Sequence, residues 1–209
     1  MLLWLVIILI SGYLIGSIPG GYIVGRLARG VDVRKYGSRN IGTTNVLRVL
    51  GKRFALYVFL IDFGKGVASV SLAYFFSIGI DSSVARALAG IACIAGHSWP
   101  LFLKFRGGKG VATSAGVFAS LTPLPFLFSL VTMIAVVAVT RYVSLGSMIS
   151  AALLPFYIWI LMGSRNPSYI YLGIATAGLI ILRHHSNLKR LFAGRENKLG
   201  ERVKITKND

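Results

Sequence analysis

Acidic residues and cysteine are scarce in this chain. The six acids are scattered, and they form neither an HExxH motif nor a carboxylate pair: Asp32, Asp62, Asp81, Glu196, Glu201 and Asp209. This scarcity argues against a carboxylate-bound metal centre, so we expect neither a metal nor a cofactor. The single cysteine, Cys93, excludes an intrachain disulfide, a CxxC redox site and a thiolate zinc cluster. We interpret Cys93 as a buried, inert thiol.

Apolar residues, in contrast, are abundant. They make up 55% of the 209 residues, the mean hydropathy is +0.72, and runs long enough to cross a bilayer recur along the chain. The first run lacks a basic segment before it and is longer than the core of a signal peptide, so we expect a retained span near 2–25. The predicted fold class is all-α: a polytopic membrane helix bundle forming one integral membrane domain over residues 1–209.

The net charge of +17 would suggest a nucleic-acid partner in a soluble chain. Here most basic residues fall within 26–53, 104–109 and 183–207, with Arg141 between the last two clusters. If all of these positions face the cytoplasm, only Arg86 and Arg165 lie on the outer side, which satisfies the positive-inside rule. We therefore expect contact with membrane lipids and no nucleic-acid partner.

The charge pattern predicts seven transmembrane helices, with the N-terminus outside and the C-terminus inside. The segment VATSAGVFASL (111–121) would rise only about 16 Å, against a hydrocarbon core of about 30 Å, so it must be a short or half-spanning helix. A break at TPLP (122–125) separates it from the next crossing. The remaining spans are expected near 2–25, 54–78, 85–103, 144–162 and 168–185.

The glycine-rich segment RGGKG (106–110) directly precedes the short helix. The positive end of that helix would face the cytoplasm at membrane depth, and the glycines would let backbone N–H groups turn inward as an anion nest. We expect this segment to bind a phosphate through Lys104, Gly107, Gly108, Lys109 and Gly110. The alternative is a flexible basic turn between two spans.

The first cytoplasmic segment, YGSRNIGTTNVLRVLG (36–51), offers neutral and cationic donors that suit a phosphate ester. They are Ser38, Arg39, Asn40, Thr43, Thr44, Asn45 and Arg48. Thr43 or Thr44 could cap a short helix that runs to Gly51, with its apolar side toward the membrane. The alternative is a solvated loop that carries positive-inside charge.

A third polar segment, RHHSNLKRLFAGREN (183–197), follows the last span. His184 and Asn187 are three residues apart and could share a helix face, with Glu196 as the nearby carboxylate. The alternative for the histidines is a cap that compensates the helix dipole.

Two further patterns within the spans indicate architecture. Asp62 and Lys65 are spaced to neutralise each other inside the second span, although Asp62 could instead relay protons. Gly12, Gly16 and Gly20 form a stripe of small residues that favours close helix packing.

These motifs resemble those of a known family. GSRNIGTTNVLR, GGKGVAT and RHHSNLKRL with a later glutamate resemble the three cytoplasmic motifs of the bacterial acyl-phosphate:glycerol-3-phosphate acyltransferases, and DFGKG resembles that family's Asp-x-x-Lys-Gly. The resemblance covers nearly the whole chain, and the motifs occur in the same order as in the family. It implies a seven-span inner-membrane enzyme that moves a fatty acyl group from acyl phosphate to glycerol 3-phosphate. The products would be lysophosphatidic acid and phosphate, in the first acylation of phospholipid synthesis.

The resemblance also implies roles for individual residues. It matches Ser38, Arg39, Asn40, Thr44 and Asn45 to the first motif, Gly107 to Gly110 to the second, and His184, Asn187 and Glu196 to the third. We expect catalytic roles for Ser38, Arg39, His184, Asn187 and Glu196, and phosphate binding by Asn40, Thr43, Thr44, Asn45 and Arg48 together with the glycine-rich segment.

Several alternatives stay open at this point. His184, His185 or the leaving phosphate could take the proton of the reaction. Arg39, among uncharged donors, is expected to neutralise a substrate phosphate, whereas Arg29 is expected to be a tolerated topology charge. The soluble enzyme that makes acyl phosphate is an implied partner. The alternative function is a membrane transporter of phosphate or an organic anion.

Overall fold

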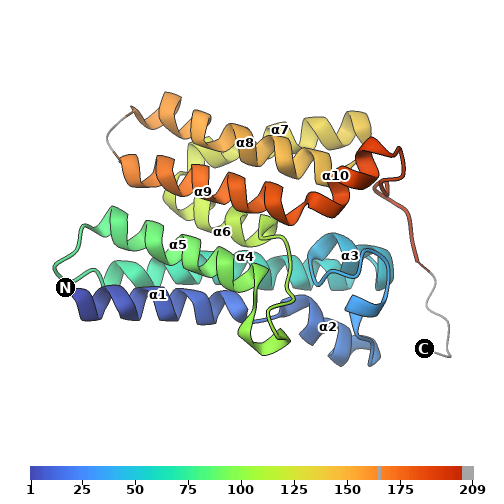
Figure 1. Cartoon of the computed structure of the whole chain (residues 1–209), viewed down its shortest axis with the longest axis horizontal. Helices are drawn as coiled ribbons and strands as arrows, with labels where there is room; N and C mark the ends of the chain where they lie inside the picture. Colours follow the sequence, from blue (N-terminus) through green and yellow to red (C-terminus); the bar gives the residue numbers. More distant parts are fainter. Residues whose placement is uncertain (164–165, 204–209) are drawn as a thin grey trace.

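The protein is an all-helical bundle in the computed structural model, which describes residues 1–163 and 166–203 (Figure 1). This confirms the predicted all-α class for the described residues. Arg165 and the basic residues from 204 onward lie outside them. The elements are α1 (Leu2–Ser17), α2 (Gly20–Arg29), η1 (Val33–Lys35), α3 (Thr43–Val49), α4 (Lys52–Phe75), α5 (Ser82–Ser98), η2 (Leu101–Leu103), α6 (Val111–Leu121), α7 (Pro123–Thr140), α8 (Val143–Met162), α9 (Pro167–Arg183) and α10 (His185–Phe192).

Four helical stretches of the described chain are long and apolar enough to cross a membrane. They are the α1–α2 stretch of 28 residues, α4, α7 and α8, while α6 and α9 are shorter apolar helices. These helices run nearly side by side, and the short helices α2, α3 and α10 gather at one end (Figure 1).

The predicted span near 2–25 lies within the helical stretch Leu2–Arg29, which is long and apolar enough to cross a membrane, but the helix is interrupted inside it. α1 ends at Ser17, and α2 starts at Gly20 after Pro19. Proline lacks the backbone N–H that would continue the ladder of helical hydrogen bonds, which explains the interruption.

The predicted break at TPLP is confirmed. α6 has 11 residues and ends at Leu121, and α7 starts at Pro123. Proline in the first turn of a helix loses no hydrogen bond, because that N–H would be unpaired in any case. The short α6 therefore lies within the bundle with its N-terminus well inside the length of its neighbours (Figure 1).

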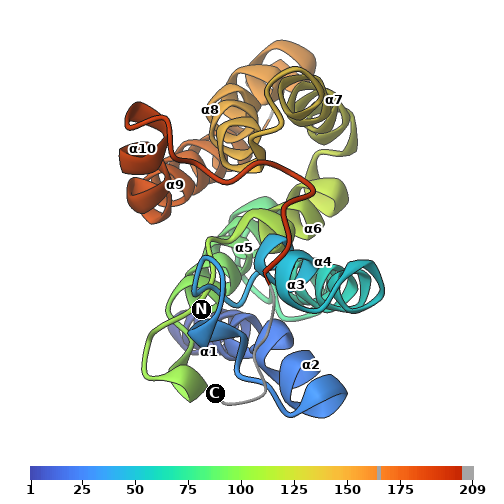
Figure 2. The same cartoon turned by 90° about the vertical axis from the view of Figure 1, so that its right-hand side faces the viewer.

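The bundle has two halves that meet at α6. Figure 2 shows α7 to α10 on one side and α1 to α5 on the other, with α6 between them. The main core joins the halves, since Val70 of α4, Phe118 of α6, Leu154 of α8 and Leu172 of α9 belong to one buried cluster.

The glycine stripe brings α1 against α5, as predicted. A Cβ added at Gly12 would lie 2.8 Å from the carbonyl oxygen of Ala89, and one at Gly16 would overlap the backbone of Cys93. Gly20 packs against Ile61 of α4 instead. Cys93 is buried at this contact, which confirms its predicted burial.

The apolar side of α3 faces the protein core, so its predicted orientation toward the membrane is wrong. Val46 and Val49 are buried, and Val46 packs with Val33 and Val58. The predicted threonine cap is also wrong: Gly42 is the N-cap, and no side chain caps the helix.

Gly16→Ala should destabilise the protein by about 1–3 kcal/mol, because the added methyl forces α1 away from α5. Gly64→Ala on α4 is the matched control, since a Cβ there meets nothing within 4 Å. It should stay within about 0.5 kcal/mol of the wild type or gain slightly from alanine's helix propensity. Thermal unfolding in detergent measures both. Equal melting temperatures for the two variants would contradict the proposed close packing.

Candidate active site

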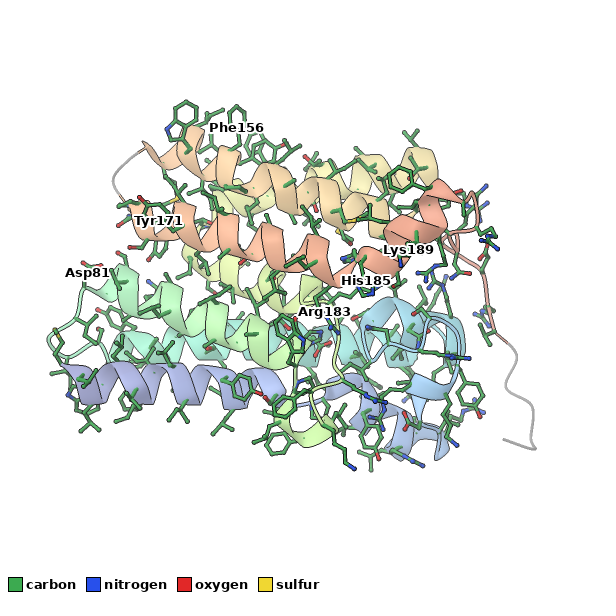
Figure 3. All side chains as sticks on the ribbon, viewed as in Figure 1. Asp81, Phe156, Tyr171, Arg183, His185 and Lys189 are labelled. Carbon is green, nitrogen blue, oxygen red and sulfur yellow. The ribbon has the colours of Figure 1, made fainter. Side chains whose placement is uncertain are left out.

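A cavity of about 290 Å³ lies where the three predicted polar segments meet. Figure 3 shows polar side chains gathered at the same end of the bundle, near Arg183, His185 and Lys189. The structure brings eleven predicted site residues to the cavity wall: Ser38, Asn40, Thr43, Thr44, Asn45, Arg48, Lys109, Gly110, His184, Asn187 and Glu196. Arg39, Lys104, Gly107 and Gly108 are not among the residues that line it.

Asn45 holds the first loop together. Its side-chain oxygen accepts from the Ser38 N–H at 2.8 Å, and its amide nitrogen lies within hydrogen-bond distance of the carbonyl oxygens of Val33, Tyr36 and Asn40. Because the three carbonyl oxygens occupy both N–H donors of the amide, Asn45 shapes the loop and has no donor left for a phosphate.

Asn40 and Ser38 have different contacts in the same loop. Asn40 accepts from the Gly42 N–H at 2.8 Å and donates to the carbonyl oxygen of Gly107 at 3.4 Å. It therefore links the first loop to the glycine-rich segment. Ser38 lines the cavity, and its backbone N–H is the group held by Asn45.

Arg48 is the arginine of this loop region that faces the cavity. It is 9% exposed, and its Nη2 donates to the carbonyl oxygen of Asn197 at 3.3 Å. Its buried Nε has no hydrogen-bond partner among the described residues, and Arg48 lines the cavity. Arg39 is exposed and adopts a positive φ of 54° at the loop surface. Of the two arginines, therefore, Arg48 lines the cavity and Arg39 does not.

The glycine-rich segment does not form the predicted nest at Gly108. Its N–H already donates to the carbonyl oxygen of His97 at 3.0 Å, and a Cβ at Gly108 would overlap the His97 ring. Arg183 donates to the carbonyl oxygens of Gly107 and Gly108 at 3.2 and 3.1 Å. Gly107 and Gly108 are therefore required for close packing, and the Gly108 N–H is already used, while the expected phosphate contact of Gly107 stays a prediction.

The end of that segment does reach the cavity. Lys109, Gly110, Val111 and Ala112 line it, so the N-terminus of α6 opens into the site. The unpaired N–H groups of a helix start favour an anion, as predicted. Lys104 is exposed and does not line the cavity, so its expected phosphate contact stays a prediction.

Glu196 joins several elements through one buried carboxylate. Its Oε1 accepts from Asn187 Nδ2 at 2.7 Å and from Ser144 Oγ at 2.9 Å, and its Oε2 accepts from Arg190 Nε at 2.7 Å. Asn187 in turn accepts from Lys109 Nζ at 2.6 Å. Glu196 thereby orients Asn187 and, through it, Lys109.

The electrostatics of this network keep both Glu196 and Lys109 charged near neutral pH. Burial alone would raise the pKa of Glu196, but the hydrogen bonds from Asn187, Arg190 and Ser144 hold it below the ordinary value. Burial lowers the pKa of Lys109 to about 8, against the opposing attraction of Glu196. Lys109 is therefore a cation at pH 7 that loses its proton in the mildly alkaline range.

His184 lies at the junction of α9 and α10 with one ring nitrogen toward its own helix. Its Nδ1 is 2.8 Å from the carbonyl oxygen of Ile180, which can only accept, so Nδ1 carries the proton and Nε2 keeps a lone pair. Burial, followed by the charge of Lys109, lowers the pKa of His184 to about 4. The ring is therefore neutral at pH 7. His185 is exposed and does not line the cavity.

The predicted Asp62–Lys65 ion pair is confirmed, and a histidine joins it. Lys65 Nζ lies 2.9 Å from Asp62 Oδ1 and 2.8 Å from His97 Nδ1, and it donates to the carbonyl oxygen of Ile18 at 3.1 Å. Asp62 and His97 both line the cavity. Among the described residues, no cluster of three or more histidines, cysteines or acids could hold a metal.

The family model for glycerol-3-phosphate acyltransferase matches residues 6–194. The chain belongs to this family. The glycerol-3-phosphate acyltransferase of Shouchella clausii is 45% identical over 204 residues, which cover 97% of this chain and 99% of that protein. The enzyme of the same name from Desulforamulus reducens is 42% identical over 197 residues, covering 94% and 96%.

Two crystal structures of PlsY (YgiH), an integral membrane glycerol 3-phosphate acyltransferase, share this fold. The glycerol 3-phosphate form has a TM-score of 0.86 at 38% identity, covering 94% of this chain and 96% of that one. The lysophosphatidic acid form has a TM-score of 0.84 at 37% identity, covering 94% and 95%. The membrane-integral bundle of the acyltransferase family is thus established for this chain.

Sequence reasoning missed several residues of the acyltransferase cavity. Ser144 and Ser147 of α8 line it, as do apolar residues of α7 such as Leu130 and Met133. Nothing in the local sequence marks the two serines. His97 was recognisable in principle, because GHSWP places a histidine at the end of an apolar span just before the glycine-rich segment.

Lys109→Arg should extend the alkaline limb of the acyltransferase's kcat/KM profile. The wild type should lose activity as pH rises through about 8, because Lys109 loses the charge that attracts a phosphate. Arginine stays protonated, so the limb should move to higher pH even if the plateau falls. Lys189→Arg, at an exposed position of α10, is the control. An alkaline limb that coincides in wild type and Lys109→Arg would exclude Lys109 as the titrating group.

Proposed function

We propose that this chain transfers a fatty acyl group from acyl phosphate to glycerol 3-phosphate. The products are 1-acyl-glycerol 3-phosphate (lysophosphatidic acid) and phosphate, and the reaction belongs to phospholipid synthesis. The observation that carries the proposal is one cavity with a cationic, hydroxyl-rich end and an apolar wall of membrane helices. Such a cavity suits one reactant that carries a phosphate and one that also carries a hydrocarbon chain.

The same proposal includes the membrane topology. Residues 1–209 form a single domain with seven crossings, the N-terminus outside and the C-terminus inside, in the bacterial inner membrane. The gathering of basic side chains at the cavity end of the bundle supports a cytoplasmic site, because positive charge is retained on that side (Figure 3). A cytoplasmic site would also receive acyl phosphate from the soluble enzyme that makes it.

The two phosphates of the reaction need separate cationic partners. Arg48 offers its buried, unpartnered Nε from α3, and Lys109 stands at the start of α6. The hydroxyls of Ser38, Thr43 and Thr44 add neutral donors on the same wall. Charge-assisted hydrogen bonds of this kind hold phosphate oxygens more strongly than neutral ones.

The chemistry needs little beyond positioning, because acyl phosphate is a mixed anhydride that is already activated. The glycerol hydroxyl oxygen attacks the acyl carbon and forms the ester C–O bond, while the bond between that carbon and the phosphate oxygen breaks. The hydroxyl proton passes to the departing phosphate, so atoms and charge balance. Lys109 and the N-terminus of α6 stabilise the charge that develops on the phosphate.

His184 orients the attacking hydroxyl in this scheme. Its Nε2 lone pair can accept the hydroxyl hydrogen bond, because Nδ1 is held by Ile180. With a pKa of about 4, the ring is a weak base, so the phosphate oxygen is the better final acceptor of the proton. Among the three possible acceptors of the proton, the leaving phosphate is therefore favoured over His184 and His185.

The proposal is tested by supplying purified protein in lipid vesicles with acyl phosphate, acyl thioester or neither, together with glycerol 3-phosphate. Phosphate release and lysophosphatidic acid formation that require both acyl phosphate and glycerol 3-phosphate are expected. Product formed only from the thioester would overturn the donor assignment. Uptake of unaltered anion into sealed vesicles would favour the transporter alternative, which gains no support from the comparisons.

Arg48→Ala should lower kcat/KM about 10- to 100-fold, the loss expected for charge-assisted hydrogen bonds to a substrate phosphate. Arg48→Lys should recover little, because lysine cannot reproduce the planar arrangement of donors. Arg39→Ala is the matched control from the exposed surface of the same segment and should stay within about twofold, the range of a tolerated surface change. Steady-state kinetics with each substrate varied gives these values, and a larger loss for Arg39→Ala than for Arg48→Ala would reverse the assignment.

A further inference from the structure

A second cavity of about 70 Å³ adjoins the first. The two share part of their walls, including Val111 and Ala115 of α6 and Phe126, Leu130 and Met133 of α7. The second cavity lies deeper between the helices, because its other lining residues are further from the cytoplasmic helix ends. Thr176, for example, is about two turns from the end of α9.

This inner cavity carries a ring of hydroxyls within an otherwise apolar wall. Five hydroxyl side chains from four helices line it: Ser114, Ser129, Ser147, Ser150 and Thr176. Those of Ser129, Ser147 and Ser150 donate to backbone carbonyl oxygens of α8. These three hydroxyls are therefore explained by their hydrogen bonds to the helix backbone.

The remaining two hydroxyls have no such explanation. Ser114 Oγ and Thr176 Oγ1 have no hydrogen-bond partner among the described residues, and the two residues are only 5% and 1% exposed. A buried hydroxyl at membrane depth is costly unless it finds a partner. A cavity of this size has room for about two water molecules, and the two hydroxyls could hydrogen-bond to them.

We propose that this hydroxyl-lined cavity is the stop for the methyl end of the acyl chain, with Ser114 and Thr176 as specificity-determining residues. The inference rests on the acyl-donor part of the proposed function. An acyl group bound with its carbonyl at the cationic end runs along the shared apolar wall of α6 and α7 toward the inner cavity. Methylenes that lie on this wall gain apolar contact.

A chain that is one or two methylenes too long meets a different surface. Its methyl end would occupy the space that water needs in the inner cavity, and the two hydroxyls would then have no hydrogen-bond partners. The gain in apolar burial is then cancelled by the unsatisfied polar groups. A chain that left the protein sideways into lipid would meet no such surface, so its length would not affect the rate in this way.

The test uses variants that remove the hydroxyls while nearly preserving shape. Thr176→Val is isosteric, Ser114→Ala removes a single oxygen, and neither breaks a hydrogen bond to a described residue. Purified variants are assayed with a series of saturated acyl phosphates, each two carbons longer than the last. For the first donor beyond the wild-type optimum, kcat/KM relative to the optimum should rise about tenfold in the double variant, with smaller rises in each single variant.

Ser120→Ala is the matched control. It removes a hydroxyl from the same helix, but this one bonds to Gly116 and lies outside both cavities, so the chain-length profile should not change. A profile that is the same in the double variant and the wild type would overturn the proposal and favour a sideways exit for the chain.

Two further results keep the test decisive. The melting temperature of each variant identifies misfolding, and if the double variant unfolds, Thr176→Val alone decides the outcome through its profile. If the wild type uses acyl thioesters instead of acyl phosphates, the donor assignment fails. The same chain-length series made with thioesters then still tests the stop, so the two failures are distinguishable.

Discussion

The buried ion cluster of Asp62, Lys65 and His97 is the interaction on which the site depends. Lys65 binds both partners and the carbonyl oxygen of Ile18 at the interruption between α1 and α2. His97 holds the N–H of Gly108 through its own carbonyl oxygen. Because removing Asp62 or Lys65 would leave an uncompensated charge inside the bundle, these two groups require each other. Together with His97, they fix the glycine-rich segment that presents the next residue, Lys109, to the cavity.

The site also needs a negative charge, because its two cations, Arg48 and Lys109, would otherwise repel each other across the cavity. Glu196 supplies the opposing charge and is held by groups from α8 and α10. The segment around it also reaches the other half of the bundle, where Asn197 accepts from Arg48 and Val203 donates to the Arg48 carbonyl oxygen. Figure 2 shows this segment crossing between the halves at the cavity end. The charge balance of the site thus also links the two halves.

The sequence predicted features governed by length and charge better than those governed by packing. The short helix at 111–121 and its break followed from the distribution of basic residues and a proline, which act locally. The sequence pointed to Arg39 as the residue that neutralises a substrate phosphate; both Arg39 and Arg48 lie within one motif, and only the fold buries Arg48. Similarly, Gly108 looked like an anion ligand until its contact with His97 gave it a packing role. Contacts between distant segments decided each of these cases.

The position of Glu196 along the chain has a consequence for biosynthesis. Every described helix precedes this residue, so Arg48 and Lys109 are synthesised before their carboxylate partner. Without Glu196, the cavity would hold cations that repel one another. Glu196 supplies the missing negative charge, and the residues that follow it contact Arg48 in the other half of the bundle. The charge balance of the site is therefore completed by a residue that follows every described helix in the chain.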